Sequence, residues 1–233
     1  MFIFNLAYAN LKITPAVVNI VAEPMSQCED RYVVTNVSDK PLTVEVTKED
    51  WKNFSGNPSD VSIDNWLVLE KSKFDIGPKE SVEVPFKVVA GKSMVGSVSG
   101  MLVFTIKSGM FNLSMKQPIY IIVKGTEKIN FKIDSLKTGI SKKDFSVYYD
   151  MVVKNTGNVH IRYSGVIEIY NKKTNELVKN VIIKQTFPVY TGTSRTFRGP
   201  VLKENNLKKG SYIAVFKITA LGKEVVKKIK FEI

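Results

Sequence analysis

The sequence predicts an all-β protein composed of two β-sandwich domains in series. Short segments in which apolar and polar residues alternate recur along the whole chain, and turn-forming residues separate them, as is typical of half-buried strands. No long segment shows the 3.6-residue period of an amphipathic helix. With 233 residues, 44% of them hydrophobic, the chain is long enough for two domains that each have a core.

In the first half, residues 42–46 and 82–88 carry valine or another apolar residue at every second position. Each segment therefore has one face toward a core and one toward water. The stretches 38–41 and 77–80, which contain Ser, Asp, Pro and Gly, supply the turns before these two strands.

The second half repeats this organisation. Its expected strands lie at 129–133, 145–153, 166–170, 177–178, 212–218 and 229–233, with a turn at 155–158 and a hairpin loop at 171–176. A short polar joint at 125–128 separates the halves, so we expect one domain at 10–124 and a second at 125–233.

The first nine residues, MFIFNLAYA, form a short apolar stretch that ends in a small-x-small pattern. This pattern is typical of the end of an export signal, although a basic segment before it is missing; an ordinary apolar first strand is the alternative. We interpret residues 1–9 as the remnant of a signal whose start lies upstream. The protein is then expected outside the cytoplasm, in the periplasm or at the cell surface.

The net charge of +12 lies entirely in the second half. Residues 10–124 contain 13 Lys and Arg and 13 Asp and Glu, whereas residues 125–233 contain 21 and 9. One face of the second domain either meets an anionic partner or is kept soluble by scattered lysines. No run of 18 apolar residues is present, so no membrane-spanning segment is predicted.

The sequence contains few residues suited to catalysis. His160 alternates with two apolar neighbours and is expected to face solvent, and Cys28 lies beside acidic residues that raise the pKa of a thiol. One His and one Cys cannot form a zinc tetrad, and no glycine-rich phosphate loop is present. Asp60 and Asp64 lack the spacing of a calcium loop. We therefore predict no enzyme, no cofactor and no metal.

Two further binding modes receive little support. Trp51 and Trp66 flank the loop 52–65 and are interpreted as core or loop-anchoring residues rather than as a stacking surface for sugars. A nucleic-acid partner is not expected, because the aromatic residues of the basic half lie on faces predicted to be buried.

The last strand of the first half has two parts. Phe111, Leu113 and Met115 occupy alternate positions, and after Pro118 a continuous apolar run covers 119–123. Since proline cannot donate to a sheet ladder, Pro118 belongs at an edge or a bulge. Either 111–115 is part of an ordinary closing strand, or its free edge is offered to another protein.

The first half resembles the N-terminal immunoglobulin-like domain of periplasmic pilus-assembly chaperones. The resemblance rests on Asn-x-Ser-Asp at 36–39, on Phe-x-Ile-x-Pro at 74–78 and on the alternating valines of 82–88. It implies that the edge strand at 111–115 is lent to a pilin-like subunit, with Phe111, Leu113 and Met115 as the contact row. The family also uses an Arg on the first strand and a Lys on the lending strand; here the first strand has no Arg, and Tyr120 aligns with the Lys.

The second half also resembles sandwich modules of bacterial cell-surface proteins, including those associated with WxL proteins. This resemblance rests on Asn155 to His160, on Phe-Pro-Val-Tyr at 187–190 and on Lys-Lys-Gly-Ser-Tyr at 208–212. Two functions therefore remain open: a pilus-chaperone-like binding protein that acts by strand addition, or a surface module that binds anionic wall polymer through its basic second domain.

Overall fold

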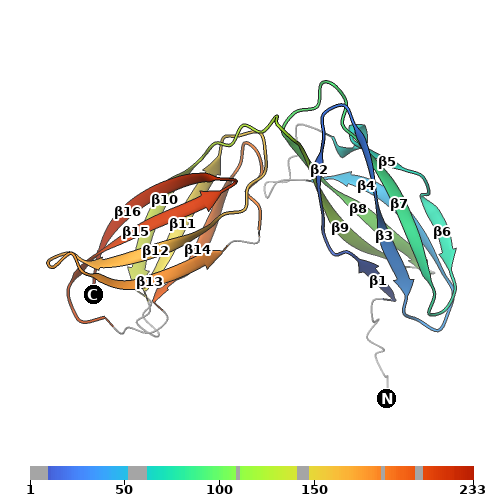
Figure 1. Cartoon of the computed structure of the whole chain (residues 1–233). Coiled ribbons are helices and arrows are strands. Elements are labelled where there is room, and N and C mark those ends of the chain that lie inside the picture. Colours follow the sequence, from blue (N-terminus) through green and yellow to red (C-terminus); the bar gives the residue numbers. More distant parts are fainter. Residues whose placement is uncertain (1–9, 52–61, 109–110, 141–146, 185–186, 203–206) are drawn as a thin grey trace, which may run out of the picture. The chain divides into compact units, whose positions relative to one another are not determined.

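A computed structural model describes residues 10–51, 62–108, 111–140, 147–184, 187–202 and 207–233. The chain divides into two compact units with a boundary between Glu127 and Lys128. Each unit consists of two facing β-sheets, so the all-β fold with two sandwich bodies is confirmed (Figure 1). Within the described residues, no helix has the length and apolar character needed to cross a bilayer.

The first unit contains one four-stranded and one five-stranded sheet. Their orders are β1-β3-β7-β5 and β2-β9-β8-β4-β6, and a short 3₁₀ helix, η1, precedes β5. The elements are β1 (Leu11–Thr14), β2 (Val18–Ala22), β3 (Gln27–Asn36), β4 (Leu42–Asp50), η1 (Ile63–Asn65), β5 (Leu67–Leu69), β6 (Lys73–Ile76), β7 (Ser81–Val89), β8 (Ser97–Ser108) and β9 (Phe111–Val123).

The period-2 patterns of the sequence correspond to faces of these sheets. In β4 the side chains of Val44 and Val46 are buried, and in β7 those of Val84, Phe86 and Val88 are buried. Their inward rows meet between the two sheets, and Tyr32 of β3 lies among them with its ring against Phe86 and Phe104.

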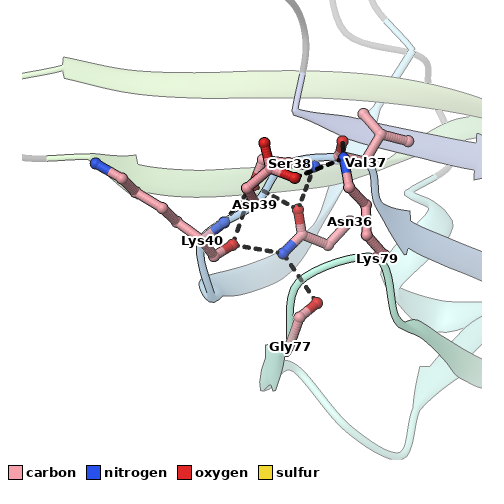
Figure 2. A network of polar contacts seen from close by, with 7 residues as sticks. All are labelled: Asn36, Val37, Ser38, Asp39, Lys40, Gly77 and Lys79. Carbon is pink, nitrogen blue, oxygen red and sulfur yellow. Dashed lines mark hydrogen bonds and ion pairs between the residues drawn. The ribbon is translucent and has the colours of Figure 1, made fainter.

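The two motifs that carried the resemblance meet at one corner of this domain (Figure 2). The side chain of Asn36 is completely buried, and its amide nitrogen lies 2.7 Å from the carbonyl oxygen of Lys40, 3.2 Å from that of Ile76 and 3.0 Å from that of Gly77. Its amide oxygen accepts hydrogen bonds from both the backbone and the hydroxyl of Ser38. One side chain thus holds the turn after β3 to the turn after β6.

The second unit contains a three-stranded sheet, β10-β11-β14, and a four-stranded sheet, β13-β12-β15-β16. Its strands are β10 (Phe131–Ile140), β11 (Val147–Asn155), β12 (Ser164–Asn171), β13 (Leu177–Lys184), β14 (Ser194–Leu202), β15 (Ser211–Ala220) and β16 (Lys223–Glu232). The hairpin expected around 171–176 is confirmed, because β12 and β13 pair antiparallel on either side of this loop.

A buried asparagine also ends a strand in this unit. The amide of Asn155 donates to the carbonyl oxygens of Val159 and Val189 at 2.7 and 3.0 Å and accepts from the backbone of Gly157. The loop between β11 and β12 is thereby held against the domain.

The prediction that His160 faces solvent is wrong. Val159, His160 and Ile161 are all buried, because Ile161 forms an isolated bridge with Val189 and the whole segment packs onto the domain. Alternation separates an inner from an outer face only in a strand with one face in water.

Candidate partner-binding site

The β8–β9 hairpin is the candidate site because β9 is paired unequally along its two edges. On one edge, β8 pairs with β9 over its length, from Ser108 opposite Phe111 to Ser97 opposite Ile122. On the other edge, β2 pairs parallel with β9 only between residues 119 and 123. The backbone of 111–117 therefore has no neighbouring strand on this edge among the described residues.

The edge is open because the first strand of the domain is divided between the two sheets. β1 pairs antiparallel with β3 in one sheet, and β2, which begins four residues after β1 ends, joins β9 in the other. β2 reaches β9 only where Val18 lies opposite Ile119. The segment of β9 before that point is left without the neighbour that a single continuous first strand would provide.

The two rows of side chains on this part of β9 differ in character. The outer row, Asn112, Ser114 and Lys116, is polar: Ser114 shares a hydrogen bond with Thr105 on β8, and Lys116 forms an ion pair with Glu49 on β4 at 2.7 Å. Ser114 and Lys116 are thus bonded to neighbours within their own sheet. The outer row gives the hairpin a hydrated outer face.

The inner row holds the residues that the sequence predicted as the contact row. Met115 lies opposite Phe104 and packs partly against the core, whereas Leu113, opposite Ile106, is 41% exposed. The backbone of Phe111 pairs with that of Ser108, and the side chain of Phe111 lies outside the described part of the structure. Apolar cover therefore decreases from Met115 toward the tip of the hairpin.

Beyond Pro118 the same row is part of the core. Ile119, Ile121 and Val123 are completely buried, as expected for the apolar continuation. Pro118 itself lies one residue before the pairing with β2 begins, so its missing N–H leaves no gap in a ladder on that side. Its carbonyl oxygen accepts a hydrogen bond from the hydroxyl of Tyr32 at 3.4 Å.

Between the exposed and the buried parts of this row lies Gln117, opposite Leu102 and itself almost completely buried. Tyr120 is also buried, but it belongs to the outer row of β9 and its ring lies 6.3 Å from that of Trp51. The inner end of the free edge thus carries a buried amide side chain, that of Gln117.

The titratable groups singled out by the sequence are poorly placed for chemistry. Burial, with a further contribution from Arg162, lowers the pKa of His160 to about 4. Burial, together with the charge of Asp30, raises the pKa of the Cys28 thiol. In the described ranges, no three His, Cys, Asp or Glu side chains are grouped as a metal site would require. Asp60 lies outside the described residues, and Asp64 forms an ion pair with Lys48.

Several lysines of the basic second unit have structural partners. Lys217 forms an ion pair with Glu168 at 2.7 Å, and Lys223 donates to the side chain of Asn130. Lys227 donates to the backbone carbonyl oxygens of Ile133 and Asp134, where the register of β10 and β11 shifts. Some of the lysines behind the charge excess therefore bond within this domain, and Lys227 links its two sheets.

Comparison with solved structures gives matches along nearly the whole chain. The Class 5 fimbriae chaperone CfaA covers 96% of this chain and 98% of its own, with a TM-score of 0.52 and 16% sequence identity. A structure described as a chaperone–tip adhesin complex, vital for activation of CFA/I fimbriae biogenesis, matches with the same coverage and TM-score at 14% identity. No protein-family model and no curated protein matches the sequence. The chain therefore has the two-domain fold of fimbrial chaperones.

Proposed function

We propose that this protein is a non-enzymatic, exported binding protein of the pilus-chaperone type, which holds a partner subunit by strand addition along β9. Phe111, Leu113 and Met115 form the contact row. The partner is a fimbrial or pilin-like protein subunit that contributes an extended strand, as the fimbrial chaperone–adhesin complex with the same fold suggests.

The observation that carries this proposal is the unpaired edge of β9 at residues 111–117. An unpaired strand edge presents N–H and C=O groups that another chain can pair with, and such pairing provides affinity while alternate side chains provide specificity. The strand meets both requirements, because its edge has no described neighbour and its inner row exposes Leu113.

The export part of the proposal depends on residues 1–9, which lie outside the described part of the structure. Their signal-like pattern and the fold of fimbrial chaperones together favour the periplasm over the cell surface. The wall-polymer alternative has less support, because several basic side chains of the second domain already bond within that domain.

The test is affinity capture of the protein from its native cell envelope at moderate salt, followed by mass spectrometry. We expect the unaltered protein to retain a small β-sandwich subunit, and the triple variant Phe111→Thr, Leu113→Thr, Met115→Thr to lose it. Ser114→Ala, on the outer row of the same strand, is the matched control and should still retain the subunit.

Hydrogen exchange of the captured complex then tests the mode of binding. Strand addition should slow exchange of alternate backbone amides between 111 and 117, because those N–H groups become hydrogen-bonded. If material binds only at low salt, or binds equally to the triple variant, the chaperone-type function is refuted and binding to anionic polymer is favoured.

A further inference from the structure

Gln117 is a polar side chain in an otherwise apolar row, and the function proposed above gives it no role. It belongs to the inner row of β9, because it lies opposite Leu102, a completely buried residue of β8. Its neighbours in this row are Met115, which packs against the core, and Ile119, which is completely buried. Gln117 is only 8% exposed, so its side chain belongs to the space between the two sheets.

The amide of Gln117 has unused capacity for hydrogen bonds. An amide can donate two and accept two, but no side-chain hydrogen bond joins Gln117 to another described residue. This amide is also not among the described polar groups that are closed off from water without a partner, so a chain that arrives along the free edge can reach it. Nearly all buried polar side chains in folded proteins are bonded, and the exception at this edge points to bonds that a partner supplies.

The position of Gln117 determines which part of a partner can reach its amide. Gln117 is the last residue of the unpaired edge, since β2 pairs with β9 from Ile119 onward. A strand added to this edge places one residue directly opposite Gln117, with its side chain on the same face and the two Cβ atoms about 5 Å apart. A polar side chain at that position lies within hydrogen-bonding reach of the amide.

The surroundings favour a neutral polar side chain over a charged one. Lys116, the adjacent cation on β9, belongs to the outer row and is paired with Glu49. A carboxylate or ammonium group that is covered here would lose its hydration without gaining an opposite charge. The inner row and the residues opposite it on β8 are uncharged: Leu113, Met115, Gln117 and Ile119, with Ile106, Phe104, Leu102 and Gly100.

We propose, on the basis of the strand addition described above, that Gln117 selects partner strands by a side-chain hydrogen bond. The partner residue opposite Gln117 carries an amide or a hydroxyl group, as Asn, Gln, Ser and Thr do, whereas the residues opposite Leu113 and Met115 are apolar. Gln117 then also fixes the register. A shift of the partner by two residues would leave the amide against an apolar side chain and cover a polar one with Met115.

Synthetic peptides of seven residues, one for each of positions 111–117, test this selection by fluorescence anisotropy with the purified chain. Both ends are capped, inward positions hold valine, outward positions hold threonine, and one terminal inward position holds Asn, Val or Asp. This position is the first residue in one series and the last in the other, because antiparallel and parallel addition place opposite ends against Gln117. In one series, the Asn peptide should bind roughly fivefold or more tightly than the Val and Asp peptides.

Gln117→Met keeps the length of the side chain and removes its hydrogen bonds. This variant should reverse the order, so that the Val peptide binds most tightly. Its midpoint of urea unfolding, followed by tryptophan fluorescence, should be unchanged or raised, because the amide has no partner to lose in the free domain. Ser114→Ala, on the outer row of the same strand, is the matched control and should keep the order of the unaltered protein.

The results distinguish a failure of this selection from a failure of strand addition. If the Asn peptide binds no more tightly than the Val peptide, but the triple threonine variant of the contact row loses both, strand addition stands and selection by Gln117 is refuted. Selection is also refuted if the Asp peptide binds most tightly, or if Gln117→Met lowers the urea midpoint by more than about 0.5 M, since the amide would then be bonded within the domain. If no peptide binds at about 100 µM, or if the triple variant binds them equally well, strand addition at β9 fails as well.

Discussion

Replacement of Asn36 by alanine should destabilise the first domain far more than the few atoms removed would suggest. The amide nitrogen has two hydrogens for the carbonyl groups of Lys40, Ile76 and Gly77, and the amide oxygen accepts two hydrogen bonds from Ser38. Four net hydrogen bonds at about 1 kcal/mol each predict a loss of about 4 kcal/mol in the free energy of unfolding. Few single substitutions reach this value.

Tryptophan fluorescence during urea unfolding measures this loss in one domain alone, because the two tryptophans of the chain, Trp51 and Trp66, both lie in the first unit. With a urea m-value of about 1.5 kcal/mol/M, the midpoint of the fluorescence transition should fall by about 2.5 M. Ser38→Ala, which leaves the amide of Asn36 in place, should cost only about 1 kcal/mol.

Asn155→Ala is the matched variant in the second domain. It removes three hydrogen bonds of the same kind and should destabilise that domain by about 3 kcal/mol. The change should appear in far-UV circular dichroism and leave the tryptophan transition in place. The reasoning fails if Asn36→Ala moves the fluorescence midpoint by less than about 0.5 M, or if Asn155→Ala moves it as far.

Two further predictions concern the second domain. Burial lowers the pKa of His160 to about 4 from an unfolded value near 6.5. Between these two pH values the unfolded chain therefore binds one proton more than the folded chain. Up to about 3 kcal/mol of stability that is present above pH 6.5 should be lost as the pH falls to 4. His160→Gln should remove this part of the pH dependence in thermal melts, and an unchanged profile would contradict it. Lys227→Met should cost about 1 to 2 kcal/mol in chemical unfolding, because two carbonyl oxygens of β10 lose their donor, whereas the neighbouring Lys228→Met should cost almost nothing. Equal losses in both variants would show that the bonds of Lys227 contribute nothing.

The fold was predictable where one face of a strand meets a core. The alternation in 42–46 and 82–88 predicted β4 and β7, because valine at every second position fits a strand with one wet face. β8 was not identified as a strand. β8 contains a stretch of apolar residues around Leu102 to Phe104 in which both faces are partly covered, so the two-residue period is lost.

The candidate site was predictable only in part for a related reason. The sequence indicated the alternation of Leu113 and Met115 and the change at Pro118, but a row of apolar residues looks the same whether a second sheet covers it or not. Whether it is covered depends on β1 and β2, which belong to different sheets and meet different partners. This long-range pairing leaves no local signal in the sequence of β9.

A final prediction concerns the length of partner strand that the free edge of β9 can accept. Beyond Gln117 an added strand finds no partner, because Pro118 has no N–H, its carbonyl oxygen accepts from Tyr32, and β2 occupies the edge from Ile119 onward. The edge from 111 to 117 therefore offers seven residues, about 23 Å of extended chain.

Synthetic peptides taken from the extended strand of a captured subunit test this limit. In a series of increasing length, affinity measured by calorimetry should rise with each residue that pairs with 111–117 and then stop rising. Peptides extended toward Gln117 should reach the plateau there, since further residues face a filled edge. Affinity that continued to increase past that point would mean that β2 is displaced from β9, and the division of the first strand between two sheets would then not define the site.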